Sequence, residues 1–183
     1  VIGSRKISDY ASRVGTRLAH ILADKEYVIV GGLAGGSDTC GHKGAMETGY
    51  TIAVMPCGLD MVVPSENTGL FLQMIDNGSL AIAEYPIGYA PTKASYVERD
   101  RLQAGIADGL IVLATSEDGG TMYAVRKAAE LHRPIGCLSP DIVEQTGNRM
   151  LINQYDSMSI NTQEDIDAFV KSLPKREHSV KGS

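Results

Sequence analysis

The sequence predicts an α/β fold with a doubly wound, mostly parallel sheet. Two observations carry this prediction: short apolar runs alternate with segments of helical spacing along the whole chain, and most of these runs are continuous and bounded by Gly, Pro or Asn. Continuous apolar runs are typical of strands covered on both faces of a parallel sheet. The chain has 183 residues, the length of one domain. We expect this domain to occupy residues 1–174 and a polar, disordered tail to follow over 175–183.

Six strands follow from the apolar runs and the turn residues beside them. They are predicted at 27–32, 51–56, 79–86, 109–115, 134–139 and 157–161. Ahead of them, Val1 and Ile2 leave room only for a clipped or very short first strand.

The helices at the two ends of the chain have clear start signals. After Ser8, a suitable N-cap, an apolar residue recurs every four positions in the first helix, at Tyr10, Val14, Leu18 and Leu22. The last helix is predicted to open at Thr162, and Asp165 three positions on suits the positive end of a helix.

Composition favours an ordinary globular protein of the cytoplasm. Hydrophobic residues make up 43% and charged residues 21%, and no apolar run approaches the roughly 20 residues of a membrane span. Cys40, Cys57 and Cys137 are odd in number and far apart, so we expect buried, reduced thiols rather than disulfides or a zinc site. The net charge of −5 means that any binding of nucleic acid needs a local basic patch.

Two polar loops near the N-terminus have the residues of an anion site. The first, "GSRKIS", places Gly3 and the Ser4 hydroxyl beside the cations Arg5 and Lys6. The second, "GGLAGGSD", follows a predicted strand and opens a helix. Its glycines expose backbone N–H groups, and the expected helix cap is a polar side chain. The residues concerned are Gly31, Gly32, Gly35 and Gly36, with Ser37 or Asp38 as the cap.

Two further loops complete the set. "YVERDRLQAG" carries Arg99 and Arg101 near the start of a helix, and "SEDGGTMYAV" leads through Gly119 and Gly120 into a helix with Thr121 in its first turn. In parallel sheets, ligands bind outside the carboxyl ends of the strands. We therefore expect all four loops to converge on one sheet edge and to form an anion site there.

Other polar residues allow two interpretations each. Asp38 and His42 share a helix face and could form an acid–base pair or two metal ligands, or else cap the helix and bond a neighbouring loop. Glu84 and Asp60 could bind a ribose hydroxyl or fix loops by accepting backbone N–H bonds. The nucleophile elbow, Walker A and dinucleotide fingerprint motifs are absent from the sequence. We predict no catalytic residue, no cofactor and no metal site.

Seven segments, in order and at matching spacing, resemble the DNA-processing protein A (DprA/Smf) family. They are "GSRKIS", "GGLAGGSDTCGH", "TIAVMPCGLDMVVPSEN", "GSLAIAEYPIGYAP", "RDRLQAGIADGLIVL", "GGTMYAVRKAAELHRPI" and "GNRMLIN". The resemblance implies an extended Rossmann-like domain that binds single-stranded DNA, forms a homodimer and, in bacterial transformation, helps to load the recombinase RecA onto incoming strands. It implies a binding protein without established catalysis. Carried over by position, the phosphate-site residues are Gly3, Ser4, Arg5, Gly32, Gly36, Asp38, His42, Arg99, Arg101, Gly120 and Thr121.

Two departures from the family pattern bear on affinity. The family usually has Ala-Arg-Gly-Ile-Asp where this chain has Gly35 in place of the arginine, and it has Arg-Asn-Arg where this chain has Asp100 in the middle. Losing a cation and gaining an acid should weaken polyanion binding and flatten its salt dependence.

A second interpretation is a small-molecule nucleotide or sugar-phosphate protein of the LOG-like phosphoribohydrolase group. "DGGT", 118–121, resembles the Pro-Gly-Gly-x-Gly-Thr turn of that group, with Glu117 or Glu130 as the acid, although the proline and one glycine are missing. If the chain is an enzyme at all, a nucleotide phosphoribohydrolase-like activity is the expectation.

Overall fold

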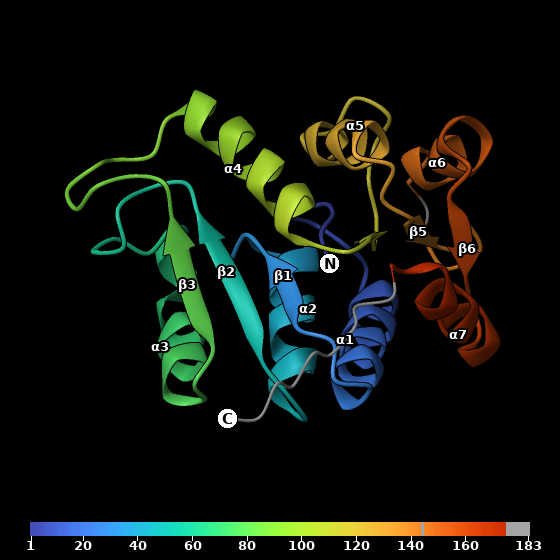
Figure 1. Ribbon diagram of the computed structural model, residues 1–183, viewed down its shortest axis with the longest axis horizontal. Helices are drawn as coiled ribbons and strands as arrows, with labels where there is room; N and C mark the ends of the chain where they lie inside the picture. Colours follow the sequence, from blue (N-terminus) through green and yellow to red (C-terminus); the bar gives the residue numbers. More distant parts are fainter. Residues whose placement is uncertain (144, 175–183) are drawn as a thin grey trace, which may run out of the picture.

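The computed structural model describes residues 1–143 and 145–174, in which strands and helices alternate (Figure 1). The strands are β1 (Ile29–Gly31), β2 (Thr51–Met55), β3 (Leu80–Ala83), β4 (Leu110–Val112), β5 (Ile135–Leu138) and β6 (Met158–Ile160). The helices are α1 (Asp9–Asp24), α2 (Ser37–Met46), α3 (Thr68–Asp76), α4 (Lys93–Ile106), α5 (Thr121–Glu130), α6 (Gly147–Tyr155) and α7 (Gln163–Ser172), with a short 3-10 helix η1 (Ser65–Asn67).

All six predicted strands are confirmed, each somewhat shorter than its apolar run. Both helix-start predictions are also confirmed. The Ser8 side chain accepts a hydrogen bond from the Ala11 N–H at 3.2 Å. Thr162 and Asp165 form a reciprocal capping box, in which the Asp165 carboxylate accepts from the Thr162 N–H at 2.8 Å. Side-chain caps of this kind satisfy N–H groups that the helix itself leaves without partners.

The strands are parallel, as predicted, but their hydrogen bonds form two three-stranded sheets rather than one. The orders are β1-β2-β3 and β4-β5-β6. The N-terminal residues join them: Ile2 forms an isolated parallel bridge with Val112 of β4, and the Val1 nitrogen donates to the Val30 carbonyl of β1 at 2.7 Å. The expected short first strand is therefore a single bridge. It is too short to make one continuous sheet.

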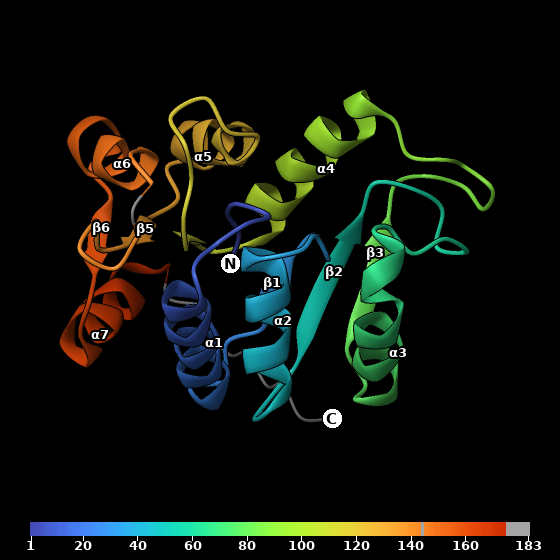
Figure 2. The same cartoon turned by 180° about the vertical axis from the view of Figure 1, so that it is seen from behind.

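Helices cover both faces of the second sheet, which is the doubly wound arrangement. Neighbouring residues of β4 point in opposite directions. Ile111 packs in a core with α1, α2 and α7, and Val112 packs in a separate core with α4, α5 and α6. Figures 1 and 2, taken from opposite sides, show these two helical layers. A third core joins α3 to β2 through Met74 and Met55.

Helix α4 lies across the carboxyl ends of β1 and β2 (Figure 1). It begins after Thr92, which with Ser95 forms a capping box. Arg99 and Arg101 therefore lie in the middle of α4, and the prediction that they sit near its start is wrong. The sequence offered "YVERDR" as the opening turn because the cap lies further upstream, directly after Pro91.

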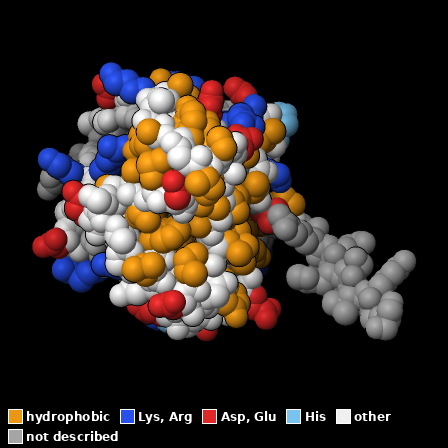
Figure 3. Space-filling view, turned by 90° about the vertical axis from the view of Figure 1, so that its left-hand side faces the viewer, with side chains coloured by type: hydrophobic (Ala, Val, Ile, Leu, Met, Phe, Trp, Pro, Cys, Tyr) orange, Lys and Arg blue, Asp and Glu red, His pale blue; other side chains and the backbone are white. Residues whose placement is uncertain are grey.

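The face formed by α3 and β3 is rich in exposed apolar side chains (Figure 3). The large exposed residues of these elements are Leu72, Ile75 and Leu80, and Ile87 in the loop after β3 is 71% exposed. β3 is also an edge strand of its sheet. This face is an open strand edge beside an apolar surface, a combination that pairs readily with another chain.

The three cysteines are free and buried, as predicted. Across the described ranges, no helix is long and apolar enough to cross a membrane. The same residues include no group of three or more His, Cys, Asp or Glu side chains placed to hold a metal ion. The predicted tail, 175–183, lies outside the described residues.

Candidate functional site: an anion-binding edge

Helix α2 opens on a backbone cap at Gly36. Gly36 has φ 67°, and a Cβ there would lie 2.5 Å from the carbonyl oxygens of Ser4 and Arg5. The N–H and the hydroxyl of Ser37 both donate to the Ser4 carbonyl, each at 3.1 Å. The prediction of a Ser37 or Asp38 side-chain cap is therefore wrong. The first loop supplies the capping oxygen, so the two loops are fastened together.

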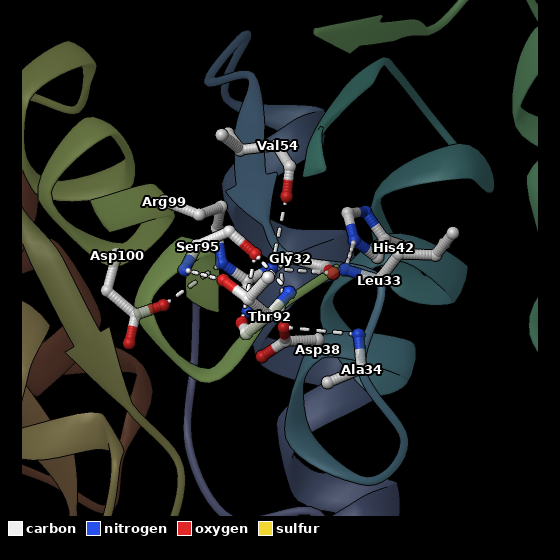
Figure 4. Close-up of polar contacts among 10 residues, drawn as sticks. All are labelled: Gly32, Leu33, Ala34, Asp38, His42, Val54, Thr92, Ser95, Arg99 and Asp100. Atoms are coloured by element: carbon white, nitrogen blue, oxygen red, sulfur yellow. Dashed lines mark hydrogen bonds and ion pairs between the residues drawn. The ribbon is translucent and has the colours of Figure 1, made fainter. Parts of the chain in front are cut away.

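Asp38 holds the glycine-rich loop from inside (Figure 4). One carboxylate oxygen accepts from the Gly32 N–H at 2.8 Å and from the Ala34 N–H at 3.3 Å. Burial raises the pKa of Asp38, while the nearby Arg99 and the two N–H donors act in the opposite direction. With only 4% of its surface exposed, Asp38 positions the loop and has little surface to offer a ligand.

His42 supports the same loop in its neutral form. Burial is the main cause that lowers its pKa to about 3, with Arg99 contributing. Its Nε2 accepts from the Leu33 N–H at 3.2 Å, so Nδ1 carries the proton and donates to the Thr51 hydroxyl at 2.7 Å. Thr51 in turn donates to the Ile29 carbonyl. This series of hydrogen bonds holds Leu33 at a positive φ of 61°, a value that is uncommon for a residue other than glycine.

Asp38 and His42 therefore follow the second of the two interpretations given above for the pair, bonding within the fold. Asp38 does so without capping the helix. His42 has no exposed surface, so we assign it to loop positioning rather than to ligand contact.

Arg99 is also an internal support. Its Nη1 donates to the Gly32 carbonyl at 2.7 Å and to the Val54 carbonyl at 3.0 Å, and its Nε donates to Asp100 at 3.0 Å (Figure 4). The guanidinium ties together the ends of β1 and β2, and Arg99 as a whole is 6% exposed. A Cβ on Gly32 would lie 1.6 Å from Nη1. The approach of Arg99 is therefore the physical reason for glycine at position 32.

Arg101 points to a different neighbour. It forms an exposed ion pair with Glu84, directly after β3, at 2.6 Å. Asp60 accepts two bonds from the Gly88 N–H, at 3.0 and 3.1 Å, and so fixes the loop after β3. Asp60 thus fixes a loop by accepting a backbone N–H, as one of its two interpretations has it, whereas Glu84 pairs with a side chain of α4.

The exposed cations of the edge come from the first loop. Arg5 and Lys6 are exposed, and the Arg5 guanidinium lies 5.5 Å from the centre of the Tyr96 ring, on which Arg99 packs at 5.8 Å. The Ser4 hydroxyl donates to Gln145 at 2.7 Å, and the Gln145 amide donates to the Lys6 carbonyl at 3.1 Å. The loop backbone is thereby fixed while its two cationic side chains face solvent.

Free backbone donors lie beside these cations. Among the described residues, the N–H groups of Gly35 and Gly36 have no hydrogen-bond partner. A Cβ on Gly35 would meet only the Arg5 carbonyl, at 3.7 Å, so the two loops are in ordinary contact there. Unpaired N–H groups at a helix start, next to exposed cations, are what an anion requires.

The fourth loop follows a backbone contact with the first loop. α5 begins at Thr121 after Gly120, around which there is open space, whereas a Cβ on Gly119 would lie 2.9 Å from the Ser116 hydroxyl. The Ser4 N–H donates to the Ala114 carbonyl, just before this loop, at 2.7 Å. The first two predicted loops thus meet, and the fourth begins two residues after Ala114, whose carbonyl accepts from the first loop. The third predicted loop lies within α4. Its Arg99 bonds to the glycine loop at the Gly32 carbonyl, and its Arg101 pairs with Glu84.

Asn148, which sequence reasoning did not select as a site residue, organises the ends of β4 and β5. It is fully buried, accepts from the Thr115 N–H at 3.0 Å and donates to the Leu113 and Leu138 carbonyls at 3.0 and 2.9 Å. Its only sequence signal was its place in "GNRMLIN". A buried amide cannot be told from an exposed one by sequence.

A shallow groove adjoins the first loop. Its two parts have volumes of about 430 and 280 Å³ and share Val143 and Gln145. Lys6 lines the smaller part, and Arg149 and Glu117 line the larger. The groove therefore continues from the first loop with walls that mix apolar, polar and charged side chains.

The family model that describes DNA recombination-mediator protein A matches residues 1–171. The chain belongs to this family. It is 33% identical over 156 residues to protein Smf of Synechocystis sp. and 34% identical over 145 residues to DNA processing protein DprA of Streptococcus pneumoniae. These matches cover 84% and 79% of this chain but only 39% and 51% of those relatives, so the chain spans about half the length of such proteins or less.

Two solved structures of the family share the fold. DNA processing protein A from Helicobacter pylori, described with a mode of binding single-stranded DNA, aligns with a TM-score of 0.86 at 29% identity, over 94% of this chain and 80% of that one. DprA from Streptococcus pneumoniae aligns with a TM-score of 0.83 at 27% identity, over 96% and 61%. A molybdenum cofactor binding protein from Rippkaea orientalis has a TM-score of 0.65 at 18% identity, a likeness of fold alone.

Proposed function

We propose that this chain is a single-stranded DNA-binding protein that holds the phosphate backbone at the edge formed by the first two loops. Membership of the DNA recombination-mediator family supports this function over a small-nucleotide enzyme, as does the similarity to a relative described as binding single strands. Single-strand binders combine cationic grooves with backbone donors that follow the phosphates.

One observation supports the proposal: a loop with exposed cations is fastened to a glycine loop in which two N–H groups have no partner among the described residues. Arg5 and Lys6 supply exposed charge, and Gly35 and Gly36 supply unpaired donors. Asp38 and His42 hold the glycine loop in place from inside, so its donors need little rearrangement when a phosphate binds. Because the net charge of the protein is −5, attraction of the DNA phosphates has to come from a local cluster of cations such as this one.

Gly3, Ser4, Gly119, Gly120 and Thr121 complete the proposed contact set. Gly3 allows the first loop to pass close to Ser37 and the Ala114 carbonyl, where a Cβ would lie at 2.5 and 2.7 Å. Gly120 and Thr121 offer the start of α5 as a further donor position. Arg101 is 52% exposed at its side chain and can contact DNA if its pair with Glu84 opens.

The test is a fluorescence anisotropy titration of labelled oligo(dT) against the protein at low salt. We expect binding in the micromolar range that weakens when Arg5 is replaced by Ala. Arg17→Ala, an exposed arginine within α1, is the matched control and should leave the affinity unchanged. A protein that ignores single strands at low salt refutes the proposal.

The wider role we propose is in DNA processing and recombination, including DNA uptake in transformation, with a RecA-type recombinase as partner and the cytoplasm as the place of action. We propose binding without catalysis, because Asp38 and His42, the acid and base of this edge, already accept hydrogen bonds from loop N–H groups. A pull-down of purified recombinase in the presence of single strands tests the partnership. Retention of the recombinase by wild type but not by Arg5→Ala supports the partnership. A recombinase that wild type does not retain contradicts it.

We also propose that the chain forms a homodimer. Two open sheet edges offer surfaces for it: β3 with the apolar face of Figure 3, and β6, where Met158 is 38% exposed. Sedimentation velocity of Leu80→Lys and Met158→Lys tells the two surfaces apart, since only the change at the true interface should yield monomers. A wild-type monomer at all concentrations contradicts the dimer.

A further inference from the structure

Asp100 places an acid inside the proposed phosphate site. It follows Arg99 on α4 and accepts from the Arg99 Nε at 3.0 Å, and its side chain is 17% exposed. Arg5, the exposed cation of the first loop, is near enough to act on Asp100 electrostatically. Arg5 and Arg99 both pack on the Tyr96 ring, at 5.5 and 5.8 Å. The carboxyl group is therefore part of the cluster that would receive a phosphate.

The charges that face Asp100 come from three elements. Arg99 lies on its own helix at 3.0 Å, and the other two charges that act on Asp100 are Arg5 of the N-terminal loop and Asp38 of α2. Burial is the main cause that raises the pKa of Asp100, to about 6. Asp38 acts in the same direction, and Arg99 and Arg5 oppose it. Asp100 thus changes its charge within the pH range in which DNA binding is measured.

We propose that Asp100 couples single-strand binding to proton uptake, so that the protein holds the phosphate backbone most tightly when the Asp100 carboxyl group is protonated. The inference rests on the proposed function. A phosphate bound beside Arg5 brings a second negative charge close to the carboxylate in a partly buried setting, where like charges repel strongly. Protonation removes that repulsion and leaves both arginines to attract the phosphate.

The sign follows from the direction of the shift. Above pH 6 the carboxylate is charged and opposes the phosphate, and below it the neutral acid does not. Bound DNA raises the pKa of Asp100 further, so affinity falls as pH rises from 5 to 8. A rise of half a unit to one unit on binding corresponds to a loss of roughly three- to tenfold across this range.

The experiment compares wild type with Asp100→Asn, which keeps the side-chain shape and the oxygen that accepts from Arg99. Oligo(dT) is the ligand because thymine does not titrate in this range. Dissociation constants are measured from pH 5 to 8 at constant ionic strength. We expect Asp100→Asn to bind at pH 8 as tightly as wild type does at pH 5. The variant should therefore lack the roughly three- to tenfold loss of affinity that wild type shows across this range. Asp76→Asn, at the end of α3 away from this edge, removes an equal charge and should keep the wild-type profile.

Melting temperatures at each pH establish that both variants are folded. Parallel pH profiles for wild type and Asp100→Asn overturn this inference and leave the proposed function standing. If neither protein binds oligo(dT) at any pH, the proposed function fails and takes the inference with it.

Discussion

Replacing Gly35 with Arg should strengthen single-strand binding, because it returns to the glycine loop the cation that its family pattern carries. The backbone at Gly35 is not in the left-handed region, and an added Cβ would meet only the Arg5 carbonyl at 3.7 Å, an ordinary van der Waals distance. The side chain can therefore be accommodated without moving the first loop. The new arginine side chain would extend from the glycine loop next to Arg5 and to the N–H groups of positions 35 and 36.

The size of the gain follows from one added phosphate contact. An exposed ion pair contributes up to ~1 kcal/mol, which is about a fivefold decrease in Kd. Each phosphate neutralised on a single strand changes the slope of log K against log salt by roughly −0.7. Gly35→Arg should therefore bind about fivefold more tightly at low salt, and its salt dependence should be steeper by about that slope.

Anisotropy titrations with oligo(dT) at several salt concentrations measure both quantities. Gln73→Arg, which adds the same charge in the second half of α3, is the control and separates a local contact from a change in net charge. If the two variants gain equally, the gain is not a contact at this edge. If Gly35→Arg is folded but neither affinity nor slope changes, the glycine loop does not lie against the DNA backbone.

Three further predictions concern the supports of the edge. Gly32→Ala should destabilise the protein by several kcal/mol in urea unfolding, because its Cβ would displace the Arg99 guanidinium. Gly120→Ala, with open space around it, should have a free energy of unfolding within about 0.5 kcal/mol of wild type. Equal effects of the two changes would contradict the packing described. Asn148→Leu should cost about 3 kcal/mol or more, since it strands three buried backbone groups, and exposed Asn153→Ala should cost little; a stable Asn148→Leu refutes the clamp. Burial raises the folded-state pKa of Asp100 to about 6, so wild-type stability should fall as pH rises through 6 relative to Asp100→Asn, and chemical unfolding that shows no such difference would contradict that environment.

The strand positions were predictable from the sequence because their signal is local. Ile111 and Val112 belong to an unbroken apolar run, and such a run has few alternatives to a buried strand. Meeting of the first two loops was predictable too, since parallel strands bring their carboxyl ends to one edge. The two-sheet pattern was not, because it depends on how many hydrogen bonds Ile2 makes on each side.

The direction of each polar side chain was beyond sequence reasoning. Arg99 and Arg101 are alike in the sequence, yet one is buried on two carbonyl groups and the other pairs with Glu84 at the surface. The two residues lie only two apart on a helix, so their side chains diverge. The Gly36 cap was missed because the oxygen that replaces a side-chain cap comes from Ser4, more than thirty residues earlier.

The most direct test of the phosphate edge is a salt series of binding to single-stranded and duplex DNA of equal length, with wild type, Arg5→Ala and Arg17→Ala. If the first two loops hold the phosphate backbone, the single strand binds more tightly than the duplex and log K falls linearly with log salt. The slope is then shallower by about 0.7 for Arg5→Ala alone. Equal slopes for all three proteins, or binding of neither DNA at low salt, would contradict this role of the two loops.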